Sequence, residues 1–597
     1  MFDTIKKIFL LLDDKQRFKL YLLQIFILAM AFFEVFTLSL IGPFFSIVND
    51  PDFLKAGNFI SQVYTLLDYK DPYNFIFNFG AFILFVLLLS SCLSMWTVWQ
   101  ISLYSQRIGA DFSVVLYNYY LHRSWIFHSN TNSSYLIKQV ANETSRVTGS
   151  IIFPIMQLIS KLFVVLVILI FLIIVNPLPA VLGVSVFGLA YFVIFKIIRQ
   201  RLSFNGTVVS LSAAERYKLL NEGFSGILDI KILNRYSYYV NKFRFESNRF
   251  ALSQGANIAL SQIPRFFIEF LAISAVICTL MFVAVGGSKE VENLLPIIAV
   301  YGFAGLKLLP YFQQIYANVS QIRSHYAAFE SIEDDLYGAL EEAGKDSSTS
   351  IDLNESLEMD SVYFKYPGAN YHALKNVSLK IKRPSFVAFV GESGSGKSTI
   401  LKVILGLLKC NEGSFKIDGR SLTVNETING AGNLGYVPQK VFLADDSIAN
   451  NIAFGVPDSD IDVDKLNRSI KFAQLESFIE SLPDGLMSHV GEDGVQLSGG
   501  QLQRIGIARA LYHSPKILIL DEATSALDTI TERSIMASIK EFSNDMLVIA
   551  IAHRLSTVEN CDEIFFMESG EVLDTGTFSD LLAKNAKFRR MALVDKD

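Results

Sequence analysis

Residues 385–408 read "SFVAFVGESGSGKSTILKVILGLL", and this stretch decides the fold of the C-terminal part of the chain. An apolar run, a glycine-rich turn and a second apolar run predict a strand, a loop and a helix, in that order. Glycines in such a turn let backbone N–H groups and the N-terminus of the helix face phosphate oxygens. The stretch therefore predicts a phosphate-binding loop after a buried strand of an α/β domain.

Three kinds of residue in this loop serve a phosphate group. The glycines let the backbone wrap around the oxygens, Lys397 adds a positive charge for the β- and γ-phosphates, and the Ser398 hydroxyl can bind Mg²⁺. The predicted loop consists of Gly391, Glu392, Ser393, Gly394, Ser395, Gly396, Lys397, Ser398 and Thr399.

The run "ILILDEATSALD" at 517–528 predicts the acidic half of the same site. Four apolar residues predict a buried strand that ends at Asp521, a candidate ligand of the metal. Glu522 follows as the candidate base that polarises an attacking water. A carboxylate pair at the end of a strand is also common as a solvated turn, but the phosphate-binding loop elsewhere in the chain favours the catalytic interpretation.

Between these two motifs lies "LSGGQLQRIGIARAL" at 497–511, a Ser/Gly stretch that opens a helix. The Ser498 hydroxyl and the backbone N–H groups of Gly499 and Gly500 again predict an anion site at the start of a helix. One chain thus carries two phosphate-binding loops for what looks like one nucleotide.

The composition of the chain is that of a membrane protein. Of its 597 residues 51% are hydrophobic and 49 are Phe. About 20 consecutive apolar residues are needed to cross roughly 30 Å of hydrocarbon. Six segments reach that length, at about 20–46, 77–101, 150–175, 178–198, 262–285 and 293–313.

The charges between these segments predict their orientation. Basic residues gather in two long connections, about 102–149 and 199–261, which places these connections and both termini in the cytoplasm. Both connections are too polar for the membrane and predict cytoplasmic extensions of the spanning helices. The outer segment at 51–69 predicts either a short amphipathic helix on the membrane surface or an ordinary loop.

An acidic, small and polar stretch near residue 330 marks the boundary between two domains. We therefore expect a membrane domain at 1–330, a linker at 331–350 and a soluble α/β domain at 351–597. The formal net charge of −6 is small for a chain of this length, so a polyanionic partner such as nucleic acid is not expected.

The order of these motifs resembles the nucleotide-binding domain of ATP-binding-cassette transporters, and LSGGQ is close to diagnostic for that family. The resemblance implies ATP and Mg²⁺ as ligands. It also implies that Ser498, Gly499, Gly500 and Gln501 of one protomer close over ATP held by the loop of the other. Because Glu522 is unsubstituted, both sites of a homodimer should hydrolyse ATP.

The same resemblance implies roles for four further residues. Gln439 in "GYVPQ" senses the metal and the attacking water, and His553 in "IAHR" contacts the γ-phosphate. Tyr366 in "FKYPG" stacks on adenine, and Asp528 in "SALD" contacts the partner protomer. The alternatives are core packing for Tyr366 and a hydrogen-bonded core histidine for His553.

Six spans followed by one such domain resemble an exporter half-transporter over essentially the whole chain. The resemblance implies a homodimer with twelve spans and short coupling helices near 130–135 and 222–227. The segment "GEDG" at 491–494 stands where exporters usually read GERG. Glu492 fits a contact with the coupling helices, whereas Asp493 departs from the family pattern.

Four charged residues in the expected spans are the candidates for binding cargo: Glu34, Arg265, Glu269 and Lys307. Each costs about 2.5–3.5 kcal/mol unless it faces a wet interior or a partner. Arg265 and Lys307 fall at inner-leaflet depth, where two cations suit the phosphate or pyrophosphate of a lipid. Alternatively, they snorkel to the interface or pair with Glu269 and Glu34. Glu34 lies further outward, which favours a role in helix pairing or in alternation between states.

The stretches "FFEVFTLSLIGPF", "IPRFFIEF" and "GLKLLP", with the outer segment, resemble the flippases of lipid-linked oligosaccharides in bacterial glycan pathways. This resemblance implies ATP-driven translocation of a polyprenyl-pyrophosphate glycan from the inner to the outer leaflet of the bacterial cytoplasmic membrane. Those flippases carry a basic residue in the second span, whereas this chain has no Lys or Arg between Lys70 and Arg107. The alternatives are export of lipid A-like lipids, amphipathic drugs or peptides and, from another class, an ATP-gated channel or sensor.

Overall fold

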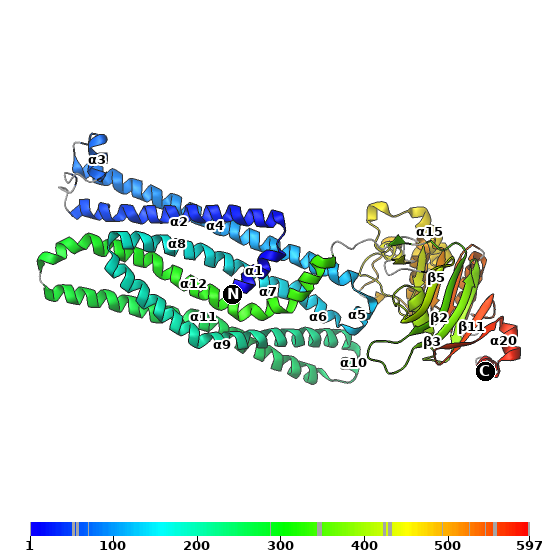
Figure 1. Ribbon diagram of the computed structural model, residues 1–597. Coiled ribbons are helices and arrows are strands. Elements are labelled where there is room, and N and C mark those ends of the chain that lie inside the picture. The colour runs from blue at the N-terminus through cyan, green and yellow to red at the C-terminus, as the bar shows by residue number, and fades with distance from the viewer. Residues whose placement is uncertain are drawn as a thin grey trace. The chain divides into compact units, whose positions relative to one another are not determined.

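The computed structural model divides the chain into two compact units, residues 1–123 with 127–345 and residues 124–126 with 346–597. The first is a bundle of helices and the second contains the sheets (Figure 1). The structure describes residues 2–49, 54, 59–69, 71–286, 288–342, 349–350, 352–421, 426–427, 433–491, 494–524, 526–543, 545–552 and 558–594.

Long helices that run side by side make up most of the first unit (Figure 1). They are α2 (Asp14–Asn49), α4 (Pro72–His122), α8 (Phe153–Val175), α9 (Pro177–Ser225), α11 (Tyr236–Gly286) and α12 (Ser288–Glu342). The shorter ones are α1 (Phe2–Leu11), α3 (Phe59–Leu66), α5 (Trp125–Asn130), α6 (Ser133–Ile137), α7 (Thr144–Val147), α10 (Ile227–Ile232) and the π-helical η2 (Lys138–Glu143) and η3 (Thr148–Ile152).

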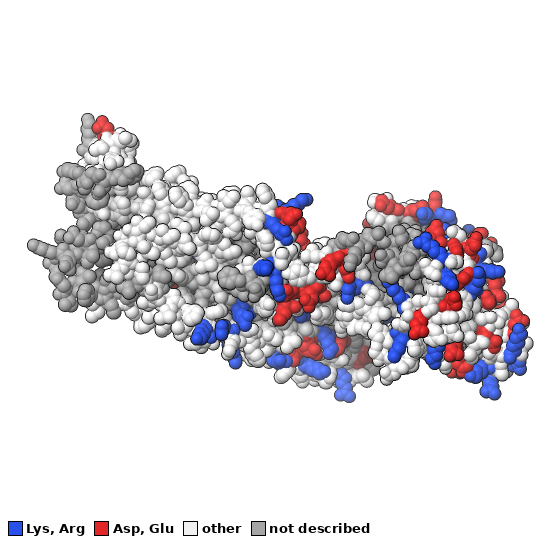
Figure 2. Space-filling view, viewed as in Figure 1, with Lys and Arg blue, Asp and Glu red and all other residues white. Residues whose placement is uncertain are grey.

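Part of this unit is apolar enough for a membrane. Among the described residues, four helical stretches have the length and composition to cross one: Asp14–Val48, Pro72–His122, Ser133–Val175 and Tyr236–Ser274. They contain most or all of the first, second, third and fifth expected spans. The fourth and sixth lie in α9 and α12 and stay predictions. Apart from the atoms drawn grey, one half of the helical unit shows almost no charged side chain on the face in Figure 2.

The long helices continue well past the expected spans. Helix α4 has 51 residues, which at 1.5 Å per residue is about 76 Å, more than twice the thickness of the hydrocarbon. The two basic connections are therefore largely helical, as predicted. Their short helices α5 and α10 are each shifted by about five residues relative to the expected coupling segments at 130–135 and 222–227, with which they share one residue.

The outer segment forms a helix where it is described. Phe59–Leu66 is α3, and its apolar residues pack on the start of α4. Phe75 is buried there against the ring of Tyr64, with the ring centroids 5.2 Å apart. The helical alternative for this segment is thus the one that the structure supports.

The second unit contains one mostly parallel sheet and one antiparallel sheet. One sheet has six strands in the order β12-β11-β4-β10-β9-β8, and another has four in the order β3-β2-β5-β6. The first comprises β4 (Ser385–Gly391), β8 (Leu434–Val437), β9 (Ile517–Asp521), β10 (Leu547–Ile551), β11 (Glu563–Glu568) and β12 (Glu571–Gly576). The second comprises β2 (Ser356–Phe364), β3 (Leu374–Lys382), β5 (Glu412–Ile417) and β6 (Arg420–Ser421), and β1 (Thr349–Ser350) pairs with β7 (Glu426–Thr427).

Strand β4 is buried on both faces because its side chains alternate between two cores. Phe386 and Val390 point into one hydrophobic cluster, and Val387 and Phe389 point into the other. Helix α13 packs on the second cluster and α17 and α18 pack on the first. The helices are α13 (Lys397–Ile404), α14 (Ile448–Ile452), α15 (Val463–Phe472), α16 (Glu476–Glu480), α17 (Gly499–Tyr512), α18 (Thr529–Phe542), α20 (Phe578–Lys584) and α21 (Ala586–Val594), with 3₁₀ turns η4 (Asp458–Asp460) and η5 (Gly485–Met487).

Candidate functional site

One edge of the six-stranded sheet gathers most of the predicted catalytic residues. Strands β4, β10, β9 and β8 are neighbours and parallel, so their carboxyl ends lie at the same edge. The phosphate-binding loop follows β4, Asp521 and Glu522 lie at the end of β9, and Gln439 follows β8. Segments that are far apart in the sequence thus meet where ligands bind in parallel α/β sheets.

The loop after β4 holds its lysine close to the backbone. Lys397 is 5% exposed, and its Nζ donates hydrogen bonds to the carbonyl oxygens of Gly391 and Glu392 at 2.7 and 2.8 Å. Gly396, with a φ of +106°, precedes α13, so the helix begins at the lysine itself. The loop therefore presents an ammonium group and a helix N-terminus together.

Two observations fit this loop to the phosphates of a nucleotide. A Cβ added to Gly391 would lie 2.1 Å from the carbonyl oxygen of Met567, so the backbone here has no room for a side chain. The Ser395 hydroxyl is buried and has no hydrogen-bond partner in the described structure. A phosphate oxygen would supply that partner.

The acidic residues and the glutamine come together as predicted. Gln439 Nε2 donates a hydrogen bond of 2.7 Å to Glu522 Oε2, and the Tyr436 hydroxyl donates one of 3.3 Å to Asp521 Oδ2. Burial lowers the pKa of Lys397, while the Glu522 and Asp521 carboxylates act in the opposite direction, so these charges share one site. The φ of Glu522 is +53°, in the left-handed region that residues other than glycine adopt infrequently.

Residues for Mg²⁺ are present at the same edge. The predicted ligands Ser398, Gln439 and Asp521 offer hydroxyl, amide and carboxylate oxygens, which are the donors that this ion prefers. In the described part of the chain, no group of three or more His, Cys, Asp or Glu side chains could hold a metal. Phosphate oxygens and water would therefore complete the coordination.

The structure describes the predicted site residue Tyr366 but not the predicted site residue His553. The Tyr366 hydroxyl lies 3.4 Å from Thr399 Oγ1, and its ring packs edge-on against Phe364 with the centroids 4.9 Å apart. Tyr366 thus lies beside the phosphate-binding loop and is also partly packed on the core. Its contact with adenine stays a prediction. His553 lies outside the described residues.

The LSGGQ segment opens α17, as predicted. Ser498 and Gln501 form a capping box, in which the Ser498 hydroxyl accepts from the Gln501 N–H at 3.3 Å and Gln501 Oε1 accepts from the Ser498 N–H at 2.8 Å. A Cβ on Gly499 or Gly500 would lie 3.3 or 3.2 Å from atoms of Ala526.

Asp528 caps the helix that follows β9. Its side chain accepts a hydrogen bond of 3.0 Å from the Thr531 N–H at the start of α18. The structure also ties this region to α17, since the Ala526 N–H donates to Gln503 Oε1 at 3.0 Å. The predicted contact of Asp528 with a partner protomer stays a prediction.

The charged residues of the expected spans fall into two groups. Arg265 and Glu269 form an ion pair within α11, with 2.6 Å between Nε and Oε1. Glu34 is 3% exposed and accepts hydrogen bonds from the Tyr311 hydroxyl and, at 3.5 Å, from the Ser94 hydroxyl. The alternative in which Arg265 pairs with Glu269 is the one that the structure shows.

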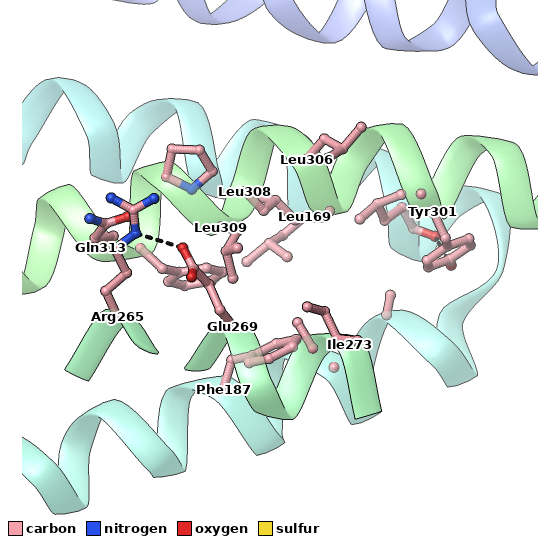
Figure 3. Close-up of a pocket in the computed structure, with 18 of the residues that line it drawn as sticks. Leu169, Phe187, Arg265, Glu269, Ile273, Tyr301, Leu306, Leu308, Leu309 and Gln313 are labelled. Carbon is pink, nitrogen blue, oxygen red and sulfur yellow. Dashed lines mark hydrogen bonds and ion pairs between the residues drawn. The ribbon is translucent and has the colours of Figure 1, made fainter. Parts of the chain in front are cut away.

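A cavity of about 560 Å³ lies between α8, α9, α11 and α12 (Figure 3). The Arg265–Glu269 pair and Gln313 lie at one end of it, and Tyr301 lies at the other end. Most of the wall between them is aliphatic or aromatic. Lys307 lies outside this lining, although the sequence pairs it with Arg265 in one expected phosphate site.

Lys161 is a charged residue that the sequence analysis missed. It lies in α8, inside the expected span at 150–175, and its Nζ is 4.7 Å from the centre of the Tyr311 ring. A lone lysine in an apolar run is the signal that identified Lys307, so the same criterion would have found Lys161.

A second apolar cavity, of about 740 Å³, lies beneath α3. Its wall comes from α2, α3 and α4 and from Leu67 and Tyr69, and it includes Pro43 and several aromatic rings. Asn78, one of its polar residues, donates a hydrogen bond of 2.8 Å to the Tyr69 hydroxyl.

Each of the two units matches a known protein family. Residues 374–525 match the family model "ABC transporter", and residues 20–301 match "ABC transporter transmembrane region". The chain is 31% identical over 471 residues, 77% of each chain, to an ATP-dependent lipid A-core flippase of Cupriavidus metallidurans. It is 28% identical over 495 residues, 82% of each chain, to one of Ralstonia nicotianae.

A solved structure shows the same fold over nearly the whole chain. A bacterial Atm1-family ABC exporter with ATP bound superposes with a TM-score of 0.75 at 20% sequence identity, covering 98% of this chain and 99% of that one. The predicted α-helical membrane domain followed by an α/β ATP-binding-cassette domain is confirmed. The chain belongs to the ABC transporter family, as an exporter half-transporter with one transmembrane region and one ATPase domain.

Proposed function

We propose that the protein uses ATP to move a phosphorylated amphipathic lipid from the inner to the outer leaflet of the bacterial cytoplasmic membrane. The observation that carries this proposal is the cavity in Figure 3, which joins an Arg265–Glu269 pair to a long apolar wall. A lipid with an anionic headgroup and acyl chains likewise has a charged end and a long apolar part. The relatives named as lipid A-core flippases support lipid A-like cargo.

The residues at the sheet edge account for hydrolysis of ATP. Lys397 and the Ser395 hydroxyl bind the β- and γ-phosphates, and the helix N-terminus at Lys397 adds to the field on them. Glu522 accepts a proton from the attacking water, while Gln439 orients the Glu522 carboxylate. Mg²⁺, when bound by Ser398, Gln439 and Asp521, would neutralise charge that develops on the phosphates.

Two copies of the chain form the working unit in this proposal. The phosphate-binding loop and the LSGGQ residues begin different helices, α13 and α17. Each ATP is enclosed by the loop of one protomer and the LSGGQ segment of its partner. The Ser498–Gln501 capping box fixes the backbone of that segment before the partner arrives.

A lipid-linked oligosaccharide is the second candidate cargo, and the cavity beneath α3 favours it. Its apolar and aromatic lining suits a polyprenyl chain. The relatives point to lipid A-like cargo instead, and the second span contains no Lys or Arg. Lipid A-like cargo is therefore the first choice, and drugs or peptides rank below both.

Reconstitution tests the proposal. In liposomes with ATP, the wild-type protein is expected to move a fluorescent lipid A-core analogue between leaflets. The Glu522→Gln variant is expected to bind ATP but not to move the lipid analogue. Hydrolysis by that variant should fall about 10²–10⁴-fold, the range for loss of a general base. A polyprenyl-pyrophosphate glycan in parallel liposomes separates the two cargoes. Equal lipid movement by both proteins would contradict the proposal.

A further inference from the structure

A short segment connects the candidate base to the LSGGQ helix. Residues 522–528 begin at Glu522 and end at Asp528, which caps α18. In the proposed function, Glu522 acts on ATP held by its own chain, whereas the LSGGQ residues close over ATP held by the partner. A contact between this segment and α17 therefore joins two different ATP sites.

The segment touches α17 at Ala526. The Ala526 N–H donates a hydrogen bond of 3.0 Å to Gln503 Oε1, and Gln503 is 4% exposed. A Cβ on Gly500 would lie 3.2 Å from the Ala526 carbonyl oxygen, and one on Gly499 would lie 3.3 Å from the Ala526 Cβ. The hydrogen bond and the two missing side chains together hold Ala526 against the start of α17.

Residues on both sides of Ala526 are fixed to the rest of the unit. The Thr524 hydroxyl donates a hydrogen bond of 3.0 Å to Glu532 Oε1 of α18, and both residues are buried. The Leu527 N–H donates to the Thr524 carbonyl oxygen at 3.1 Å, and Leu527 is buried in the hydrophobic cluster on which α17 and α18 pack. A shift of Glu522 is therefore passed to α17 through Ala526, because Thr524, two residues away, has little freedom to absorb it.

Gln503 is a polar residue at a core position. Its buried neighbours on α17 include Ile505, Ile507 and Ala508. A buried amide costs free energy unless it is hydrogen-bonded, whereas a leucine of similar size would be stabilised by the same burial. Packing alone thus does not account for Gln503, and its bond to the backbone of Ala526 does.

We propose that Gln503 is a positioning residue that couples the two ATP sites of the dimer. This inference rests on the two-copy arrangement in the proposed function. Through Ala526, Gln503 makes the position of the LSGGQ segment depend on the position of Glu522 in the same chain. ATP bound at one site then raises the affinity of the other site for ATP, and the effect is reciprocal.

The dependence of hydrolysis on ATP concentration tests this role. The full-length protein is placed in phosphatidylcholine nanodiscs with excess Mg²⁺, and the initial rate is measured over a range of ATP concentrations. The wild-type protein should give a Hill coefficient well above 1, up to about 2, since two sites are coupled. Gln503→Leu removes the acceptor oxygen, so the Hill coefficient should fall to about 1 and the half-maximal ATP concentration should rise roughly fivefold or more. The maximal rate should change much less, because both sites fill at saturating ATP.

Gln503→Glu is the matched control. Its carboxyl group keeps an oxygen that can accept the Ala526 N–H, so the Hill coefficient and the half-maximal concentration should stay close to those of the wild type. The melting temperature of Gln503→Leu should lie within about 4 °C of the wild-type value, because one hydrogen bond is lost. A change in cooperativity without a large change in melting temperature distinguishes positioning from general damage to the fold.

The outcomes separate this inference from the proposed function. A Hill coefficient near 1 in Gln503→Leu, with cooperativity kept in Gln503→Glu, supports the coupling role. Unchanged cooperativity or a large fall in melting temperature in Gln503→Leu, loss of cooperativity in both variants, or a wild type that is not cooperative overturns the inference and leaves the proposed function standing. If the wild-type protein does not hydrolyse ATP, the proposed function fails and the inference fails with it.

Discussion

At the scale of single residues, the phosphate-binding loop holds the side chain of Lys397 in a fixed position. Lys397 is buried, and backbone carbonyl groups of its own loop hold its ammonium group. The carboxylates of Asp521 and Glu522 offset part of the cost of burying this charge. The lysine is therefore held in position before a nucleotide arrives, which reduces the entropy lost on binding.

Replacement of this lysine should abolish turnover without loss of the fold. Lys397→Ala removes a charge that acts on the phosphates in the transition state, so kcat for ATP should fall roughly 100-fold or more. ATP hydrolysis in detergent or nanodiscs measures the effect. Lys409→Ala, an exposed change shortly after α13, is the control and should keep wild-type turnover. Wild-type turnover in Lys397→Ala would contradict the assignment of the loop.

The residues of the ATP site were predictable because their chemistry depends on local order in the sequence. Gly391, Lys397 and Asp521 occupy motifs whose strand and helix context can be read directly. The bond between Gln439 and Glu522 joins residues 83 positions apart, so only the resemblance to a family suggested that they meet. The side chains that contact Tyr311 depend on helix rotation, and neither Glu34 nor Lys161 was predicted to lie there.

At the scale of elements, α9 and α12 touch through their backbones. A Cβ added to Gly206 of α9 would lie 1.9 Å from the carbonyl oxygen of Ser324 on α12. No side chain fits between the helices at this point. The close approach therefore fixes how these two long helices pack in the predicted cytoplasmic extension.

A single methyl group should disturb this contact. Gly206→Ala forces the two backbones apart, which should cost about 1–3 kcal/mol and lower the melting temperature of the full-length protein. Gly255→Ala on α11 is the control, because nothing lies within 4 Å of the added Cβ. Alanine favours helix at such a site, so the control should be neutral or slightly stabilising. Equal melting temperatures for the two variants would refute the close contact.

Another contact joins elements of the second unit. The Asp562 carboxylate accepts hydrogen bonds from the Phe386 N–H of β4 at 2.7 Å and from Lys540 Nζ of α18 at 2.6 Å. Burial by itself would raise the pKa of Asp562, but the bonds to Lys540 and Phe386 hold it below its ordinary value. The carboxylate thus fastens a strand to a helix.

This contact should make stability depend on pH. A carboxyl group whose pKa is lowered by folding stabilises the protein above its unfolded pKa, about 3.9, and loses that effect as the pH falls through the folded value. Asp562→Asn should lower the melting temperature at pH 7 by about 2–4 °C, and the difference from wild type should shrink below about pH 4. Glu541→Gln, an exposed change on α18, should show neither effect. A difference that is constant with pH would contradict this account.

The elements themselves were predicted with uneven success. Periodicity and length located the long helices and the buried strands, because burial of apolar side chains decides both. The π-helical segments η2 and η3 carry no signal of that kind, since an extra residue per turn depends on neighbouring helices. The predicted positions of the coupling helices differ by about five residues from those of α5 and α10, because polar connections lack a strong hydrophobic pattern.

At the scale of the whole molecule, the candidate ATP site and the candidate lipid cavity lie in different units. One carries the residues that we propose for ATP hydrolysis, and the other carries the cavity that we propose for the lipid. The family and the order of the domains followed from the sequence because its motifs occur together and in the order typical of the family. The cargo did not, because it depends on cavity shape and on which charges are neutralised inside the bundle.

A mixed dimer can show whether each ATP site is shared between protomers. Lys397→Ala damages the loop of one chain, and Ser498→Arg damages the LSGGQ segment of the other. If sites are shared, a dimer with one chain of each kind keeps one site with both parts intact and should hydrolyse ATP, whereas each variant alone should not. Differently tagged chains, purified by both tags, allow the measurement. An inactive mixed dimer would contradict shared sites.

Because α12 is long, a small tilt at one end of this helix produces a large displacement at its other end. At 1.5 Å per residue its 55 residues span about 82 Å, so a tilt of about 10° at one end would displace the other by about 14 Å. That displacement is nearly half the thickness of the hydrocarbon core. Because α9 and α12 meet backbone to backbone at Gly206, they would swing together. A slight rotation at one end of α12 would therefore displace both helices at the other end.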